Sequence, residues 1–450
     1  MVDDGDQGWL EAGELDRRTA ALAGGLTALG CAPGDRVLWE SEASVPGILV
    51  ALAILRAGLV LVPVSARQSA VERATVIADV EPVVVVSPEK PPVAGGGHRW
   101  TTAMAIDAGV PPAHLDAVTG DDLALIVYTS GTTGDPKGAM ITHGNLAAQA
   151  DGLVTAWGWG ASDRLLSALP LFHVHGLVVA LLVGMTTGGG VIVQPSFSAG
   201  SFLRAMREHR ATMAFCVPTM LHRMAAHEEL SAVEDLRLLV SGSAPLSVEL
   251  FESFARRGVP ILERYGMTET LLTVSNPLVG ERRAGTVGRA LPGVMLDAPE
   301  PGAAPRELRV AGPTVFAGYW RKPDATAAVL EDGWMRTGDV VRTDDAGYLV
   351  VCGRVKELII TGGFNVYPSE VEDVLCAVPG VLEAAVVGEP SSEWGEVVVA
   401  HVVTADGTLD HAALERGIEV LSPYKRPRRF VLATTLPRNA LGKLQRHLLR

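Results

Sequence analysis

The feature that most constrains the fold is a regular alternation of helical and strand-like segments along the first 87 residues. Leu15, Leu22, Leu26 and Leu29 share one face of a helix, and Gly30 is placed to end it. Parallel strands need crossover connections, which are usually helices, so this alternation predicts a mostly parallel sheet covered by helices. We predict helices at 13–29, 45–56 and 70–79, and strands at 35–39, 59–64 and 82–87.

The alternation resumes at residue 123 and changes character after about residue 284. Asn145 is the candidate cap of a helix at 144–157. Further on, the DDAG turn at 344–347 predicts a hairpin, and helices and strands alternate again from residue 369. The remaining predictions in this part are a helix at 177–184 and strands at 123–128, 190–195, 212–218 and 236–243.

A chain of 450 residues exceeds one ordinary domain, so we predict two domains in an overall α/β fold. The first, at 1–353, contains mostly parallel sheets and helices plus a small β-rich part. The second, at 354–450, is a compact α+β unit, and we place the hinge between them near 354–357.

Composition narrows the class of protein. The net charge of −13 argues against a general nucleic-acid or anionic-membrane binder. None of the four cysteines forms a CxxC pair, and no secretion signal is evident, so we expect a reduced, cytoplasmic protein. The most apolar segment, at 48–64, contains Arg56, Gly58 and Pro63, which favours a buried helix and strand over a membrane span.

The segment YTSGTTGDPKG at 128–138 lies between two apolar runs and is rich in glycine and hydroxyl groups. Glycines allow backbone N–H groups to approach an anion, hydroxyls add donors, and Lys137 adds positive charge. A polyphosphate is the natural ligand, although the spacing is not that of a Walker P-loop. The alternative is a solvated linker between strands.

Two further polar clusters fit a nucleotide. In ERYGMTET at 263–270, Tyr265 is suited to stack on a base, Thr268 to bind phosphate and Glu269 to hold a divalent cation. In RTGD at 336–339, Asp339 is suited to accept both ribose hydroxyls, and an ordinary Asx turn is the alternative. Arg354 in GRVKE is a candidate nucleotide contact or a surface salt bridge.

A fifth motif, PRNALGKLQR at 437–446, sets Lys443 after a glycine close to the end of the sequence. Taken alone, such a lysine is more often a solvated tail residue. The five motifs together, in this order and spacing, resemble the adenylate-forming superfamily, which contains acyl- and aryl-CoA synthetases, peptide-synthetase adenylation domains and firefly luciferase. The family usually has more residues before the first helix, so a truncated or misassigned start is also an expectation.

The resemblance implies an acid–thiol ligase that uses ATP, Mg²⁺ and, as co-substrate, coenzyme A. A carboxylate attacks the α-phosphate of ATP and gives an acyl-adenylate and pyrophosphate, and a thiol then attacks the adenylate. The small domain is expected to rotate between these half-reactions, with Lys356 at the hinge. Lys443 is expected to bridge the carboxylate and the α-phosphate, and its ammonium suits both partners.

The other site positions also come from the resemblance. The phosphate-binding loop matches at Thr129, Ser130, Gly131, Thr132, Thr133, Gly134 and Lys137. Glu269 matches the magnesium ligand and Thr268 a phosphate contact, while Asp339 and Arg354 match ribose and nucleotide contacts. The adenine pocket matches at Gly242, Ser243, Ala244, Pro245, Tyr265 and Gly266, and Gly362 and Gly363 match the turn that meets the thiol.

The acid is indicated by a narrower resemblance. His173 follows Phe172 where amino-acid-activating domains carry an aspartate, so an α-amino acid is not expected. LPLFHVHGL, ERYGMTETL and RAGTVG together look like the malonyl-CoA synthetases. There Arg283 is expected to bind the distal carboxylate of malonate or methylmalonate, with His175 close by. In the other direction, GGFNVYPSEVE at 362–372 looks more like fatty-acyl and aryl ligases.

Several alternatives remain open from the sequence. Arg283 could be structural, and the acid a medium- or long-chain fatty acid held in an apolar tunnel. The acceptor could be a carrier protein, although the insertion typical of acyl-AMP ligases is not evident. A degenerate nucleotide-binding protein is a further class, against which Lys443, Glu269 and Asp339 count. We expect no nucleic-acid partner and no stable membrane insertion.

Overall fold

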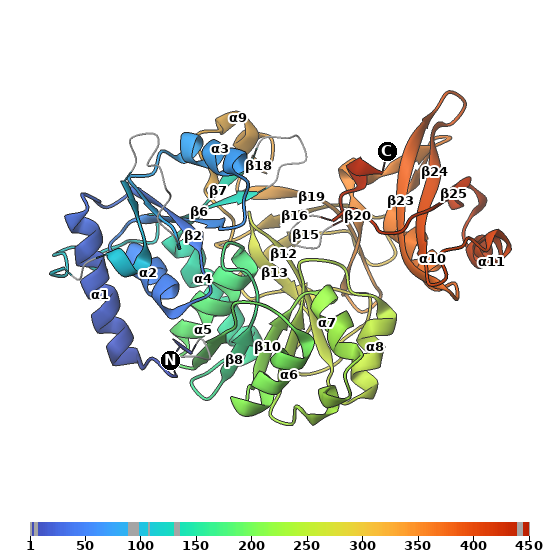
Figure 1. Ribbon diagram of the computed structural model, residues 1–450. Helices are drawn as coiled ribbons and strands as arrows, with labels where there is room; N and C mark the ends of the chain where they lie inside the picture. Colours follow the sequence, from blue (N-terminus) through green and yellow to red (C-terminus); the bar gives the residue numbers. More distant parts are fainter. Residues whose placement is uncertain are drawn as a thin grey trace. The chain divides into compact units, whose positions relative to one another are not determined.

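The structure is a computed structural model that describes residues 2–3, 8–88, 99–106, 109–129, 136–438 and 444–449. The chain divides into two compact units (Figure 1). Unit one comprises Met1–Leu296 and Val310–Met335, and unit two comprises Asp297–Arg309 and Arg336–Arg450. Each unit is described by itself.

The first sheet of unit one has seven strands in the order β17-β7-β6-β3-β2-β4-β5. Its strands from β6 to β5 pair in parallel, which confirms the prediction of a mostly parallel sheet. At the other edge, β7 pairs with β6 in antiparallel fashion, and β17 pairs with β7 in the same way. The bounds are β2 (Arg36–Ser41), β3 (Val60–Ser65), β4 (Val84–Val86), β5 (Arg99–Thr101), β6 (Leu123–Thr129), β7 (Lys137–Thr142) and β17 (Gly318–Tyr319).

The second sheet of unit one has eight strands in the order β1-β9-β8-β10-β11-β12-β13-β14. Neighbouring strands pair in parallel from β1 to β12. At the β12 end of the sheet, β13 and then β14 are added in antiparallel fashion. Its strands are β1 (Val2–Asp3), β8 (Arg164–Ser167), β9 (Gly190–Val193), β10 (Met213–Cys216), β11 (Leu238–Ser241), β12 (Ile261–Met267), β13 (Leu271–Ser275) and β14 (Arg289–Ala290).

Helices cover both sheets, as the sequence predicts. Figure 1 shows α1 and α2 beside the first sheet, and α6, α7 and α8 grouped beside the second. The bounds are α1 (Ala12–Ala28), α2 (Val45–Arg56), α3 (Ala70–Val80), α4 (His143–Trp157), α5 (Val183–Thr186), α6 (Ala199–Glu208), α7 (Pro218–Ala225), α8 (Val248–Arg256) and α9 (Pro323–Ala327).

The apolar segment at 48–64 is buried inside unit one. Its residues form most of α2 and all of β3 except Ser65, and most of them belong to the hydrophobic core. Across the described residues, no helix combines the length and the apolar character that crossing a bilayer requires.

Two local predictions need correction. The cap of α4 is Thr142, whose hydroxyl accepts the amide N–H of Asn145 while the Asn145 side chain accepts the N–H of Thr142. Asn145 is therefore the third residue of a capping box, and its amide also donates to the carbonyls of Pro313 and Val315. The helix predicted at 177–184 begins as a π-helical segment at His175–Leu182 and continues as α5.

Unit two begins with a β-rich part. Strands β19 (Trp334–Thr343) and β20 (Leu349–Arg354) pair in antiparallel fashion, which confirms the hairpin at the DDAG turn. The Asp344 carboxylate accepts the backbone N–H groups of Ala346 and Tyr348 and so closes that turn. The sheet that contains β19 and β20 also contains β15 (Met295–Asp297), β16 (Arg306–Ala311) and β18 (Leu330–Glu331), and β18 belongs to unit one.

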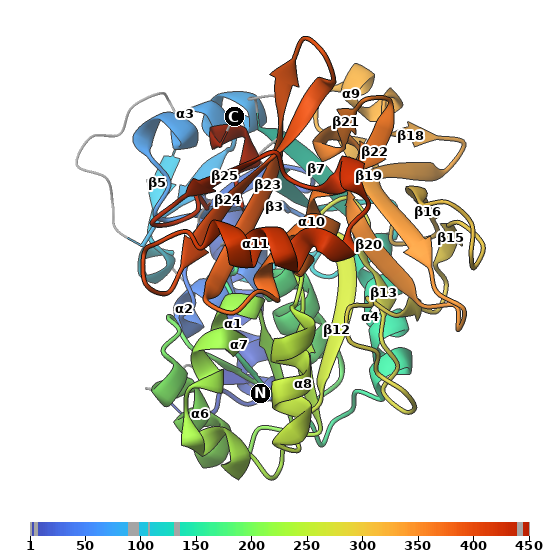
Figure 2. The same ribbon diagram turned by 90° about the vertical axis from the view of Figure 1, so that its right-hand side faces the viewer.

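The remainder of unit two is the predicted α+β part. Its five-stranded sheet runs β22-β21-β24-β23, with β25 paired to β24. Figure 2 shows α10 and α11 over one face of this sheet, where Leu375 and Leu414 join the strand residues in one core. The bounds are α10 (Pro368–Cys376), α11 (His411–Gly417), β21 (Ile359–Thr361), β22 (Phe364–Val366), β23 (Val381–Ser391), β24 (Gly395–Thr404) and β25 (Arg429–Leu432).

The predicted hinge at 354–357 covers the last residue of β20 and the 3₁₀ turn Val355–Glu357. Contacts place the division into compact units earlier, because the hairpin β19–β20 packs with residues 297–309. The division into compact units does not show where the chain bends during catalysis. The domain boundary at 353/354 and the hinge at 354–357 therefore stay predictions.

Candidate active site

The ends of the glycine- and hydroxyl-rich loop are held by the pairing of β6 with β7. Thr129 lies opposite Lys137, and the Thr129 hydroxyl donates to the Lys137 carbonyl at 3.4 Å. Ser130, Gly131, Thr132, Thr133 and Gly134 lie outside the described residues.

Glu269 lies just after β12 and is buried. Its Oε1 accepts the hydroxyl of Tyr319 at 2.8 Å, and its backbone carbonyl accepts the N–H of Phe316. The Lys137 ammonium lies 5.3 Å from the centre of the Tyr319 ring. Three distant parts of the chain therefore meet around the Tyr319 side chain, and two of the residues, Lys137 and Glu269, are predicted site residues.

Tyr319 was missed by the sequence reasoning. Burial and the Glu269 carboxylate raise the pKa of its hydroxyl, which therefore remains a hydrogen-bond donor. The FAGYW segment contains no motif that would point to this role. Only the antiparallel pairing of β17 with β7 brings the ring to Lys137 and Glu269.

The residues present fit a magnesium ion that arrives with a nucleotide. Magnesium is usually held by one or two carboxylates together with phosphate oxygens, and the Glu269 carboxylate keeps Oε2 for such a contact. Among the described residues, no group of three or more metal-binding side chains is present, so a site made by the protein alone is not seen.

The adenine-pocket positions lie directly after β11 and within the last residues of β12. Gly266 lies at a bulge of β12, where a Cβ atom would come within 2.1 Å of the Leu271 carbonyl. Gly242 is equally constrained, because a Cβ atom would lie 2.4 Å from the Arg264 guanidinium. Ser243, with φ of 72°, adopts a left-handed conformation that is uncommon for residues other than glycine and clusters at functional sites.

Other predicted positions of this pocket are more open. Ala244 and Tyr265 are half-buried, Pro245 is exposed, and Thr268 is buried beside Glu269.

The predicted acid-binding residues have different surroundings. His175 is buried, its Nδ1 lies 3.2 Å from the Ser243 hydroxyl, and its ring stacks on Phe215. Burial and the nearby Arg264 charge hold the pKa of His175 well below its usual range, so the imidazole is neutral. Arg283 is one-third exposed, and its Nε lies 3.0 Å from a Glu281 carboxylate oxygen.

In unit two, Asp339 and Arg354 are direct partners across β19 and β20. The Arg354 Nε lies 3.1 Å from the buried Asp339 carboxylate, so the two predicted nucleotide contacts lie together. Gly362 and Gly363 form the exposed turn between β21 and β22, with φ of 56° and 82°. Lys356 lies in the 3₁₀ turn after β20.

Lys443 lies outside the described residues, but the segment after it is anchored. Arg446 donates to the carboxylates of Glu357 and Glu372 at 2.8 and 2.7 Å. Leu444 also forms an isolated bridge with Arg438. Both ends of the stretch that carries Lys443 are therefore fixed to unit two.

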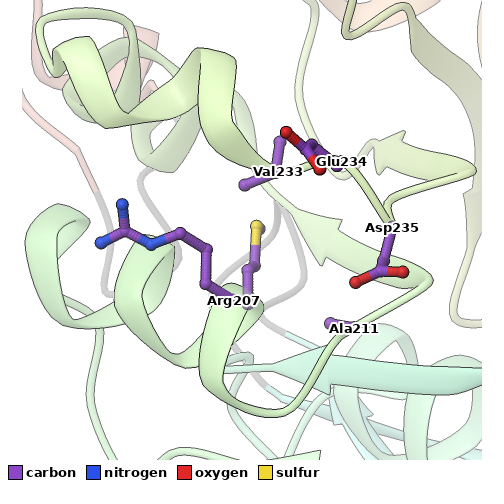
Figure 3. Close-up of a pocket in the computed structure, with 6 residues that line it drawn as sticks. Arg207, Ala211, Val233, Glu234 and Asp235 are labelled. Carbon is purple, nitrogen blue, oxygen red and sulfur yellow. The ribbon is translucent and has the colours of Figure 1, made fainter.

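A small pocket beside α6 is a weaker candidate for a ligand-binding site than the residues around Glu269. Figure 3 shows the Arg207 and Asp235 side chains pointing to opposite sides of it. Both groups already have ionic partners, since Arg207 pairs with Glu229 and Asp235 with Arg210. None of the predicted site residues lines this pocket.

Comparisons with known proteins agree with the motif positions. The profile of the AMP-binding enzyme family matches residues 1–320, and that of the AMP-binding enzyme C-terminal domain matches residues 370–443. A feruloyl-CoA synthase from Amycolatopsis sp is 38% identical over 96% of this chain and 91% of its own length. A mitochondrial malonate–CoA ligase from Mus musculus is also 38% identical, over 72% of this chain and 63% of its own length.

A solved structure supports the same assignment. ATP-bound MatB from Rhodopseudomonas palustris is 37% identical, covers 100% of this chain and 94% of its own, and has a TM-score of 0.93. That similarity extends through both units and so includes all five motifs. The chain therefore belongs to the AMP-binding enzyme family and, with these relatives, to its AMP-forming acid–CoA ligases.

Proposed function

We propose that this ligase activates a short dicarboxylic acid, malonate or methylmalonate, and transfers it to coenzyme A. ATP binding is supported mainly by the buried Glu269 carboxylate. It accepts the hydroxyl of Tyr319, whose ring lies beside Lys137 of the phosphate loop. The acid is supported by the malonyl-CoA-synthetase-like motifs and by similarity to a malonate–CoA ligase.

In the first half-reaction, a carboxylate oxygen of the acid attacks the α-phosphorus of ATP, and the bond to pyrophosphate breaks. Two anions must approach each other, so positive charge and orientation are the main needs. Lys137 and the loop N–H groups would hold the β- and γ-phosphates, and Lys443 would bridge the two reacting groups. Magnesium, held by Glu269, would neutralise charge on the phosphates.

We infer that Asp339 and Arg354 contact the nucleoside. The Asp339 carboxylate is suited to accept the ribose hydroxyls, and Arg354, paired with it, orients the carboxylate. In the second half-reaction the thiol of coenzyme A attacks the acyl carbonyl and AMP leaves. Gly362 and Gly363 would line its approach after rotation about Lys356, since a glycine turn permits close passage.

The test is pyrophosphate release with malonate, methylmalonate, ferulate and octanoate, each with and without coenzyme A. We expect the highest kcat/KM with a dicarboxylate, and an acyl-CoA product identified by mass spectrometry. Higher kcat/KM with octanoate or ferulate would contradict the acid assignment. Pyrophosphate release without acyl-CoA formation would instead favour transfer to a carrier protein.

A second test addresses Lys443. Lys443→Ala should abolish most adenylation but preserve thioester formation from supplied acyl-adenylate, because the lysine contacts only the first transition state. Equal loss of both half-reactions would argue against the two-conformation mechanism.

A further inference from the structure

Two buried amide side chains of α4, Asn145 and Gln149, contact the two segments of unit one that adjoin Glu269. The two residues are four positions apart, so they lie on the same side of the helix, one turn from each other. Asn145 is 8% exposed and Gln149 is fully buried. Figure 1 and Figure 2 both show α4 beside β13, the strand that follows Glu269.

The first amide, Asn145, binds the chain just before β17. Its Nδ2 donates to the carbonyl oxygen of Pro313 at 2.7 Å and to that of Val315 at 2.9 Å. The next residue, Phe316, donates its backbone N–H to the carbonyl of Glu269 at 2.8 Å. Asn145 is therefore connected to the backbone of Glu269 through one short, hydrogen-bonded segment.

The second amide, Gln149, binds the start of β13. Its Oε1 accepts the N–H of Leu272 at 2.5 Å, and both residues are buried. The preceding residue, Leu271, has a φ of 54°, a left-handed conformation that is uncommon for a bulky residue and persists only where its surroundings hold it. The Gln149 contact therefore fixes the strand that leaves the turn carrying Glu269.

We propose that Asn145 and Gln149 are positioning residues, which set the Glu269 carboxylate for the magnesium ion that arrives with ATP. This inference rests on the proposed role of Glu269, and it requires neither amide to touch the nucleotide or the metal. Magnesium demands near-octahedral geometry and takes few protein ligands, so a single carboxylate must be placed accurately. The Glu269 backbone is held from one side through Asn145 and from the other through Gln149, and Tyr319 orients the carboxylate itself.

The competing explanation is that the amides serve only the stability of the fold. Asn145 also belongs to the capping box of α4, in which its Oδ1 accepts the Thr142 N–H and the Thr142 hydroxyl accepts the Asn145 N–H. The two functions can be separated. Asn145→Asp keeps the capping oxygen but loses the amide donors, whereas Thr142→Ala loses the capping hydroxyl and keeps those donors, which makes it the matched control.

The first measurement is the melting temperature with ATP and EDTA, and then with ATP and Mg²⁺. A bound ligand stabilises the folded state, so the additional rise with Mg²⁺ reports metal that the protein helps to hold. We expect this magnesium increment to vanish in Glu269→Gln and to fall by more than about half in Asn145→Asp and in Gln149→Met. Thr142→Ala should melt at a lower temperature without ligand but keep the increment.

The second measurement separates the half-reactions, using the acid that the wild type activates best. Pyrophosphate release should fall about 10-fold in Asn145→Asp and in Gln149→Met, and high Mg²⁺ should restore part of it. Thioester formation from supplied acyl-adenylate requires no ATP and should change less than about twofold. Asn145→Asp combined with Tyr319→Phe should lose less than the product of the single losses, because both act through Glu269.

Equal losses in both half-reactions of Asn145→Asp and Gln149→Met, or lower melting temperatures with an unchanged magnesium increment, would overturn the inference and leave the amides a role in the fold alone. Loss of the increment in Thr142→Ala would overturn it too, because capping would then explain the effect. If Asn145→Asp does not fold, Gln149→Met carries the same comparison. An unchanged increment in Glu269→Gln would instead refute the proposed role of Glu269, and the inference with it.

Discussion

Glu263→Gln offers a test of the buried electrostatics behind the site. Glu263 is buried in β12, its Oε2 has no partner among the described residues, and its carboxyl accepts the Leu246 N–H. Burial raises the pKa of this carboxyl from 4.5 to about 8. In the unfolded chain the pKa returns to about 4.3.

The sign of the effect follows from proton binding. Between pH 4.5 and 8 the folded protein holds a proton that the unfolded chain has lost, so this group makes stability fall as pH rises. Below pH 4.5 both states are protonated and the cost is absent. At about 1.4 kcal/mol for each pH unit, the cost that has accumulated at pH 8 is about 5 kcal/mol.

Glutamine stays neutral at every pH, so the variant should lack this slope. The assay is urea unfolding of both proteins at pH 6, 7 and 8, followed by tryptophan fluorescence. Seven of the eight tryptophans lie in unit one and only Trp394 lies in unit two, so the signal reports mainly on the unit that contains Glu263. The stability difference in favour of Glu263→Gln should grow with pH. Parallel stability curves for the two proteins would refute the reasoning.

Three further predictions concern single contacts. Tyr319→Phe removes the 2.8 Å hydrogen bond to Glu269 and should lower adenylation by about 10-fold or more, with a higher Mg²⁺ requirement, measured by magnesium titration of pyrophosphate release. Arg446→Met leaves the buried Glu372 without its cation and should destabilise unit two by about 3–5 kcal/mol, measured by hydrogen exchange. Asp163→Ala removes a buried carboxylate that accepts hydrogen bonds from three residues and should cost unit one about 3–5 kcal/mol in urea unfolding. Unchanged values in any of these assays would count against the contact in question.

Much of the architecture follows from local sequence alone. The alternation of helices and strands before residue 87, the DDAG hairpin and the final α+β part depend on periodicity and turn residues, which act over a few positions. Asn145 shows the limit of that information. Its residue type suits a cap, but whether it caps or fills the third position depends on where the preceding strand ends.

The candidate site divides in the same way. Motif residues such as Glu269, Asp339 and Lys137 could be named from the sequence, because the nucleotide chemistry needs those residue types in that order. The hydrogen bond of Tyr319 to Glu269 and the unpartnered atoms of Arg264 could not, because they depend on strand register and on packing inside the fold.

The sequence by itself determined the class of fold and the nucleotide chemistry of this protein, since both are encoded in local patterns and in short motifs. Only the tertiary structure decided which arginine is buried without a counter-ion among the described residues. Arg264 and Arg283 are alike as residues, but Arg283 can reach Glu281 and water, while the packing around Gly242 isolates Arg264 beside His175. Because the cost of a buried charge depends on all its neighbours, such a difference is not visible in the sequence.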